Sequence, residues 1–211
     1  MDCIKIRDNI YWVGVLDPEM RIFDIVFKTD QGTTYNSYLI KDKKTALIDT
    51  VKKPFTTEFI SNLKSQIDLK DIDYIIVNHT EPDHSGALLE LLKYAGNAKV
   101  MVSKSGGHLL KNIINVPVDL TIIEDNTVVD LGGCELRFIS APYLHWPDTI
   151  WTYLEKEKIL FTCDAFGSHF CDERMFDDLV GDFDNHFHYY YDSIMRPFKP
   201  HILKAIEKIG E

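Results

Sequence analysis

The chain of 211 residues is long enough for one domain or two small ones, and its hydrophobic content of 45% can form a sizeable core. Its formal net charge of −10 argues against a surface that binds nucleic acid or anionic membranes, because either surface needs a basic patch. The start MDCIKIRDNI is unlike a signal peptide, and no apolar run approaches the roughly 20 residues of a membrane helix. We therefore expect a cytoplasmic protein. Its four cysteines form no CxxC pair, and we expect them to be reduced thiols because the cytoplasm is a reducing compartment.

The first predicted elements are hairpins. Residues 4–15 predict two strands around a turn at Asp8 and Asn9. Residues 33–50 predict a clearer hairpin, in which the apolar runs YLI and TALID flank the charged turn KDKK.

Helices and buried strands follow these hairpins. Residues 56–67 carry apolar side chains at helical spacing, and Thr56 or Thr57 is the expected N-cap. The short apolar run YIIVN, residues 74–78, is typical of a strand that is buried on both faces.

A second strand and two more helices are predicted next. Ser85 is the expected cap of a helix over residues 85–94. The following strand is predicted over residues 99–103, and the following helix over residues 106–114.

The second half of the chain predicts consecutive strands and then helices. The strand segments are LTIIED, TVVDL, ELRFISAP and TIWTYLEKEKILFTCD, and the last of these is a hairpin. Residues 188–209 predict two helices separated by Pro197 and Pro200. Because hairpins dominate both ends, a doubly wound sheet fits less well than two packed sheets with helices outside.

One segment concentrates metal-binding side chains. NHTEPDHSG, residues 78–86, has four possible ligands within six positions: His79, Glu81, Asp83 and His84. They follow a buried strand, and the loop at the carboxyl end of such a strand is a usual place for a site. In an extended segment, alternate side chains at 79, 81 and 83 could point the same way, and His84 would then point elsewhere. One loop could thus supply ligands to two adjacent metals, His79 and Glu81 to one and Asp83 and His84 to the other.

Two later residues stand in similar places. His145 follows the strand LRFISAP, and Asp164 follows the strand KILFTC. Any one of these residues could simply belong to a solvated loop. The whole HxExDH cluster with His145 and Asp164 is better explained by a metal site, because buried charges are costly unless they are paired or bound to metal.

Other histidines are expected to have other roles. His186 and His188 form an HxH pair that precedes a helix without further ligands, so they are expected at the surface or in packing contacts. His169 is the best candidate to support the metal ligands from behind, because it closely follows Asp164. The tyrosine run 189–191 is expected in the core or at an interface.

The cluster resembles the metallo-β-lactamase superfamily, whose usual signature is HxHxDH, a later His, a bridging Asp and a final His. Glu81 stands where the second His would be. With HWPDT, CDAFGSHFCDE and GTTYNSYLI, the pattern is similar to the diiron domain of the flavodiiron proteins over essentially the whole chain. The resemblance implies that residues 1–211 form one α/β domain, a metallo-β-lactamase-like αββα sandwich.

The resemblance also implies the metal ligands. One iron would be held by His79, Glu81, His145 and the bridging Asp164, and the other by Asp83, His84 and Asp164. Asp83, His84 and Asp164 are the expected catalytic residues. Glu81 makes the ligand set harder and more anionic, which suits iron, whereas His-rich sets suit zinc; zinc can still outcompete iron for such ligands.

This sequence departs from the family pattern in three places. The second iron normally takes a further His after another strand, and this chain ends at KAIEKIGE before such a segment. Family members normally continue into a flavodoxin-like domain that holds FMN, so FMN would come from a missing domain or a separate flavoprotein. Many members carry a His in the region RIFDIVF, where Asp24 stands here.

The function implied by the resemblance is reduction of O₂ to water or of NO to N₂O, with a flavodoxin- or rubredoxin-type electron donor and a head-to-tail homodimer. The sequence does not choose between O₂ and NO. Three alternatives stay open: a diiron O₂ sensor, a zinc-dependent hydrolase of the metallo-β-lactamase type that uses a metal-bound hydroxide, and a truncated domain that folds poorly.

Overall fold

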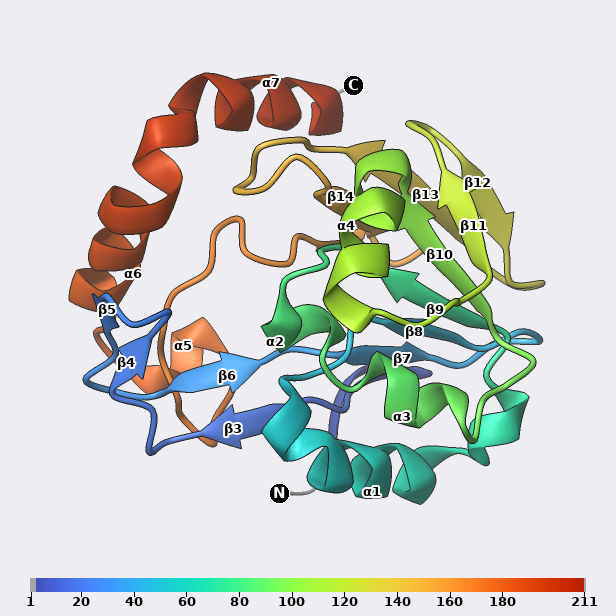
Figure 1. Ribbon diagram of the computed structural model, residues 1–211. Helices are drawn as coiled ribbons and strands as arrows, with labels where there is room; N and C mark the ends of the chain where they lie inside the picture. The colour runs from blue at the N-terminus through green and yellow to red at the C-terminus, as the bar shows by residue number, and fades with distance from the viewer. Residues whose placement is uncertain (1–2, 211) are drawn as a thin grey trace.

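A mixed seven-stranded sheet forms the first half of the fold (Figure 1). The computed structural model describes residues 3–210. In spatial order the strands are β1 (Ile4–Arg7), β2 (Ile10–Trp12), β7 (Tyr38–Ile40), β8 (Ala46–Ile48), β9 (Tyr74–Val77), β10 (Lys99–Ser103) and β11 (Leu120–Ile123). The strands from β1 to β8 pair antiparallel, and those from β8 to β11 pair parallel. The hairpins predicted for residues 4–15 and 33–50 are confirmed.

A second sheet has four antiparallel strands. They are β12 (Val128–Asp130), β13 (Glu135–Ser140), β14 (Ile150–Leu154) and β15 (Ile159–Phe161). Two short ribbons complete the strands: β3 (Val15–Asp17) with β6 (Thr33–Tyr35), and β4 (Ile22–Phe23) with β5 (Phe27–Lys28). The predicted strand LTIIED corresponds to β11. Unlike the strands that follow it along the chain, β11 belongs to the first sheet, where it pairs with β10.

Helices lie on the outer faces of the two sheets (Figure 1). The α-helices are α1 (Thr56–Gln66), α2 (Pro82–Ser85), α3 (Leu88–Leu92), α4 (Lys104–Ile114), α5 (Asp177–Val180), α6 (Asp184–Tyr190) and α7 (Lys199–Ile209). Short 3₁₀ turns are η1 (Lys53–Phe55), η2 (Leu69–Asp71) and η4 (Arg196–Phe198), and η3 (Tyr191–Met195) is a π-helical turn. None of the helices within residues 3–210 combines the length and apolar character needed to cross a bilayer.

The core shows why YIIVN predicts a doubly buried strand. Ile75 packs with Phe59 of α1 on the helical side of the first sheet. Its neighbour Ile76 packs with Phe138 of β13 between the two sheets. On the far side of the second sheet, Trp151 packs with Ala205 of α7. The order helix, sheet, sheet, helix confirms the predicted αββα sandwich.

Helix starts differ from the sequence predictions. The predicted N-cap at Thr56 or Thr57 is wrong, because turn η1 leads directly into α1 and Phe55 occupies the cap position. The predicted cap role of Ser85 is also wrong. Ser85 is the last residue of α2, and its hydroxyl donates to the Thr80 carbonyl at 2.8 Å. The predicted helix over 85–94 is therefore shorter: α3 covers Leu88–Leu92, and the separate helix α2 ends at Ser85.

The C-terminal tail has the two predicted helices, α6 and α7, with turns η3 and η4 between them. Pro197 lies in the connection, but Pro200 lies in the first turn of α7. A proline is well placed there, because the first turn of a helix needs no backbone donor from it.

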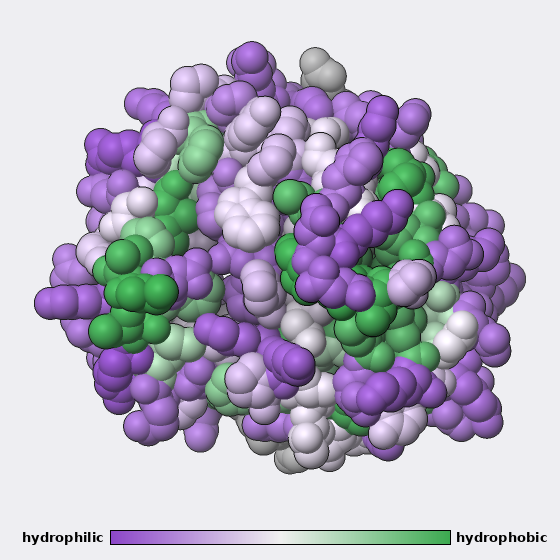
Figure 2. All heavy atoms as spheres, in the orientation of Figure 1, coloured by the Kyte–Doolittle hydropathy of each residue, from purple (hydrophilic) through white to green (hydrophobic). Residues whose placement is uncertain are grey.

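The face seen in Figure 2 is mostly hydrophilic, with a hydrophobic patch over the β4–β5 hairpin. Ile22, Ile25 and Val26 are exposed at this hairpin, and 93% of Ile25 is accessible to solvent. Exposed apolar patches of this kind often mark contact surfaces.

Candidate metal centre

The six predicted ligands lie at one edge of the paired sheets. Strands β8, β9 and β10 run parallel, so their carboxyl ends share that edge. The ligands come from the loop after β9 and from α2 (His79, Glu81, Asp83, His84), from the loop between β13 and β14 (His145), and from the loop after β15 (Asp164).

Asn78 fixes the start of the ligand loop to both sheets. Its backbone N–H donates to Asp49 Oδ1 at 2.7 Å. Its side-chain amide donates to the Phe161 carbonyl at 3.0 Å and accepts from the Thr152 hydroxyl at 2.7 Å. His79 is consequently held between the sheets and is fully buried.

Four side chains converge on one point. One ligand atom from each of His79, Glu81, His145 and Asp164 lies within 4.8 Å of all the others. Glu81 Oε2 is 3.1 Å from the Nε2 atoms of both His79 and His145. His79 Nε2 is 3.2 Å from Asp164 Oδ2. Separations of about 3 Å are those of ligands that share one metal with bonds of about 2.0–2.2 Å.

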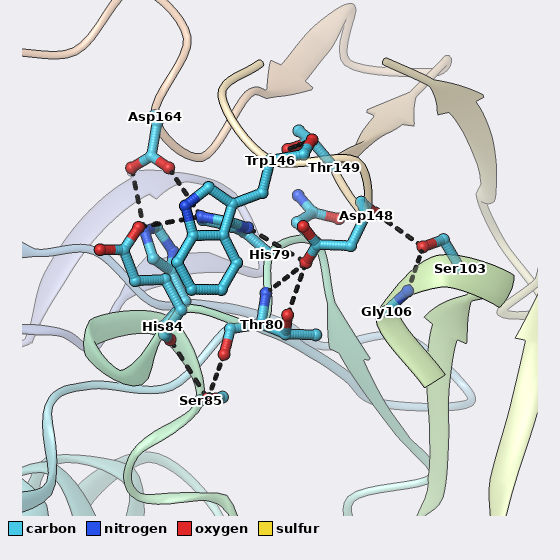
Figure 3. A network of polar contacts seen from close by, with 12 residues as sticks. His79, Thr80, His84, Ser85, Ser103, Gly106, Trp146, Asp148, Thr149 and Asp164 are labelled. Carbon is cyan, nitrogen blue, oxygen red and sulfur yellow. Dashed lines mark hydrogen bonds and ion pairs between the residues drawn. The ribbon is translucent and has the colours of Figure 1, made fainter. Parts of the chain in front are cut away.

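A second group adjoins the first through Asp164. His84 Nε2 lies 3.0 Å from Asp164 Oδ1 and 3.6 Å from Asp83 Oδ2. The Asp164 carboxylate thus turns one oxygen toward His79 and the other toward His84 (Figure 3). Asp83 Oδ1 is buried and accepts no hydrogen bond from the described residues, and Asp164 Oδ2 is buried with His79 Nε2 3.2 Å away but without a well-aligned hydrogen bond. Unpartnered buried carboxylate oxygens are unusual, and bound cations would satisfy them.

Asp148 orients the ring of His79. Its Oδ2 accepts from His79 Nδ1 at 3.1 Å and from the Thr80 backbone N–H and hydroxyl, each at 2.7 Å (Figure 3). The Asp148 carbonyl accepts from the Ser103 hydroxyl at 2.7 Å, which ties the loop to β10. With its proton held on Nδ1, His79 presents Nε2 to the centre, as metal-binding histidines usually do.

Asp49 has the same relation to His84. His84 Nδ1 lies 3.2 Å from Asp49 Oδ2, so Nε2 of His84 faces Asp164. Neither supporting aspartate was predicted from the sequence. The signals were present, because Asp148 belongs to the motif HWPDT and Asp49 ends the strand segment TALID.

The ligand charges strongly perturb the histidines. Burial opposes protonation of His79, but the charge of Asp164 and hydrogen bonds to Asp148 and Glu81 outweigh it and raise the pKa of His79 to about 10. Burial likewise opposes protonation of His84, and the charges of Asp83 and Asp164 raise its pKa well above the ordinary value. The centre therefore attracts positive charge strongly.

The carboxyl groups of the site differ in pKa: those of Glu81 and Asp164 are lowered, and that of Asp83 is raised. Burial alone would raise the pKa of Glu81, but hydrogen bonds from His145 and His79 bring it below its ordinary value. Burial also opposes ionisation of Asp164, and the charges of His84 and His79 lower its pKa in the same way. Burial, which the charge of His84 only partly offsets, raises the pKa of Asp83 to about 6, and repulsion by Asp164 contributes.

Asp24, which the sequence marked as a departure from the resembled pattern, lies beside Glu81. Burial, a hydrogen bond with Glu81 and repulsion by Glu81 raise the pKa of Asp24 to about 6. The hairpin β4–β5 thereby brings a further carboxyl group to the ligand Glu81.

His169 has a different contact from the one expected. Its Nδ1 lies 3.1 Å from the Thr33 hydroxyl, and its ring packs against Phe23 and Tyr190 with centroids 4.5 and 5.0 Å away. Burial lowers its pKa to about 4. It therefore packs behind the site as a neutral ring and does not orient a ligand through a hydrogen bond among the described residues.

The HxH pair has no place in the metal centre. His186 packs against Phe170 with ring centroids 5.3 Å apart, and His188 is exposed. In the tyrosine run, Tyr190 is buried in the core as predicted, whereas 43% of Tyr189 is exposed.

Comparison with known proteins adds independent information. The family model described as ODP family beta lactamase matches residues 33–208. The flavo-diiron protein FprA2 of Clostridium acetobutylicum is 50% identical over 98% of this chain and 53% of its own length. The anaerobic nitric oxide reductase flavorubredoxin of Salmonella arizonae is 41% identical over 98% of this chain and 44% of its own length.

Solved structures agree with these relatives. The flavodiiron protein from Giardia intestinalis superposes with a TM-score of 0.94 at 34% identity, over 98% of this chain and 51% of that chain. The rubredoxin oxygen:oxidoreductase from Desulfovibrio gigas superposes with a TM-score of 0.95 at 32% identity, over 99% of this chain and 53% of that chain. The chain spans about half the length of the relatives it matches.

Proposed function

The chain belongs to the ODP family of beta-lactamase-like domains, and from this we propose that it is the diiron domain of a flavodiiron-type oxidoreductase that reduces O₂ to water, NO to N₂O, or both. The observation that carries the proposal is the Asp164 carboxylate, which faces His79 with one oxygen and His84 with the other. A carboxylate in that position can bridge two metals, and each neighbouring group supplies further ligands.

The donor set supports iron. His79, Glu81 and His145 would hold one iron, Asp83 and His84 the other, and Asp164 both. Three carboxylates among six ligands make a hard, anionic set that suits Fe(II) and Fe(III), although zinc binds such ligands too. The buried oxygens Asp83 Oδ1 and Asp164 Oδ2, which accept no well-aligned hydrogen bond from the described residues, fit cations at both positions. When bound, the irons would supply the redox chemistry that reduces the diatomic substrate.

The protein's own groups would position these ligands. Asp148 and Asp49 would keep protons on the Nδ1 atoms of His79 and His84, so that both Nε2 lone pairs face the centre. The indole of Trp146 stands edge-on to the His79 ring, with centroids 5.1 Å apart, and limits the access of water from that side. Asp83, His84 and Asp164 would border the position where the substrate reacts, because their group offers three ligands, one fewer than the other group, and would leave more coordination positions open.

Electrons would come from FMN. The matched relatives are about twice as long as this chain, and two of them, the flavorubredoxin and the rubredoxin oxygen:oxidoreductase, are named for a rubredoxin. We propose a flavodoxin- or rubredoxin-type donor, with FMN supplied by a further domain or a separate flavoprotein. We also propose that this chain forms a homodimer in the cytoplasm. The exposed apolar patch of Ile22, Ile25 and Val26 supports an interface close to Asp24 and Glu81.

The proposal is tested by turnover of the iron-loaded chain. The chain is supplied with reduced FMN or flavodoxin, and consumption of O₂ and of NO is followed with electrodes. Asp164→Asn is expected to abolish both activities, because an amide cannot bridge two metals as a carboxylate does. Asp125→Asn, which changes an exposed aspartate paired with Lys208, should leave them unchanged.

Other outcomes would replace the proposal. Tight O₂ binding without turnover would indicate a sensor. Ester or thioester hydrolysis with zinc bound would indicate a hydrolase. Reduction that survives Asp164→Asn would refute the assignment of the site.

A further inference from the structure

A small cavity lies beside the metal centre, on the side of Asp164. Its volume is about 40 Å³. One wall is formed by the loop after β15, with Ala165 and Gly167, and the other by the helical arc from α6 to α7, with Tyr190, Met195 and Ile202. Figure 1 shows this arc, in red, at the edge of the molecule above the orange loop.

The cavity is lined almost entirely by apolar groups. Ala165, Tyr190 and Met195 are buried, and Ile202 is half-buried. A buried water needs two to four polar partners, and roughly 10–15 Å³ is enough space for one. This cavity has the space without the partners, so a small apolar molecule fits it better than water does. Empty apolar cavities in proteins bind xenon and similar ligands for the same reason.

The position of the cavity relative to Asp164 is fixed by the backbone. The Gly167 N–H donates to the Asp164 carbonyl at 3.0 Å, and the Thr162 hydroxyl donates to the Ala165 carbonyl at 2.8 Å. The loop that carries the bridging ligand is therefore the loop that forms the cavity wall. Displacing this wall would displace Asp164.

Tyr190 lines the cavity, and its ring also packs against His169, with centroids 5.0 Å apart. Burial, followed by the charges of Asp164 and Asp83, raises the pKa of Tyr190 well above its ordinary value. Tyr190 thus borders the cavity, and the carboxylates of both ligand groups raise the pKa of its hydroxyl. Phe166, which is 52% exposed, lines the same cavity, so the cavity adjoins the surface of the protein as well as the loop that follows Asp164.

We propose that this cavity is a binding site for a small apolar gas molecule, through which the diatomic substrate reaches the metal centre past Asp164. The binding site stands on the shape and lining of the cavity. Its role in substrate delivery rests on the proposed reduction of O₂ or NO.

Xenon tests the binding site without any catalytic activity. Crystals of the chain are pressurised with xenon, and the anomalous signal locates the bound atoms. Ile202→Phe places a larger side chain against the cavity, and Leu203→Phe, at a neighbouring position that is 52% exposed, makes the same kind of change on the outside of α7. We expect xenon in this cavity in the wild-type chain and in Leu203→Phe, and loss of that xenon in Ile202→Phe. No xenon in the wild-type cavity, or equal occupancy in Ile202→Phe, would overturn the site.

Kinetics of the iron-loaded chain test the delivery role. Ile202→Phe is expected to raise the KM for O₂ several-fold with little change in kcat, and Leu203→Phe to leave both unchanged. An unchanged KM in an Ile202→Phe variant that has lost xenon would overturn delivery through this cavity. If none of the three proteins reduces O₂ or NO while xenon still binds as expected, the proposed function fails and the gas-binding site remains.

Discussion

Replacement of Asp148 by Asn isolates the effect of a supporting charge on metal affinity. Asp148 Oδ2 accepts three hydrogen bonds, one from His79 Nδ1 and two from Thr80. An amide oxygen at the same position can accept all three, so Asp148→Asn keeps the shape and removes the negative charge behind His79. In the Asp148→Asn variant, His79 is expected to donate electrons to a metal more weakly, and its ring is held less firmly.

The expected effect is a loss of metal affinity of about tenfold to hundredfold, as is usual for groups that orient a metal-binding histidine. That range corresponds to about 1.4 to 2.8 kcal/mol of binding free energy. A second effect falls on folding. Asp148 Oδ1 has no hydrogen-bond partner among the described residues, so an amide NH₂ at that position would be a buried donor without an acceptor. Such a group destabilises by about 1–3 kcal/mol.

The two effects are measured separately. Anaerobic titration with Fe(II) against a chromophoric chelator gives the affinity, and urea unfolding of the metal-free chain gives the stability. Asp125→Asn is the control, because Asp125 is exposed and its contacts are with Lys208 and the Ser140 backbone N–H and not with a predicted ligand. An Asp148→Asn variant that binds Fe(II) as tightly as the wild-type chain would refute the role given to Asp148.

Two further predictions concern the ligands themselves. Glu81→His creates the HxHxDH pattern and is expected to shift metal preference toward zinc, because imidazole suits zinc better than a carboxylate-rich set does. The zinc-to-iron ratio in the chain after exposure to both metals measures this preference. An unchanged ratio would argue against the role given to Glu81. The metal-free chain is expected to lose stability as the pH rises from 7 to 10. The pKa of His79 is raised from 6.5 to about 10 in the folded chain, so its protonation stabilises the fold fully below pH 6.5, and this contribution disappears as the pH approaches 10. A urea midpoint that stays constant over this range would contradict the charge assigned to His79.

Much of the fold could be predicted because its determinants are local. YIIVN is an unbroken apolar run, and β9 places Ile75 and Ile76 in different cores on its two faces. Errors arose where a contact from elsewhere decides the local structure. Ser85 has the composition of a helix cap, yet its hydroxyl binds the Thr80 carbonyl in the tight turn that carries the ligands.

The candidate site follows the same rule. The six predicted ligands stand at strand ends, and the parallel order of β8, β9 and β10 brings such ends to one edge. Asp148 and Asp49 were missed because their role depends on which histidine each one faces across the site, and sequence spacing does not report that. The position of the cavity beside Asp164 depends on how the arc from α6 to α7 packs, which the spacing of prolines in the tail does not specify.

The central claim is that one chain holds two irons bridged by Asp164. The most direct test is elemental analysis of the anaerobically purified chain after addition of Fe(II) and removal of unbound metal. We expect about two irons per chain, falling to one or none in Asp164→Asn. A single iron in the wild-type chain would contradict the diiron centre in this chain, and zinc that Fe(II) does not displace would contradict the redox function.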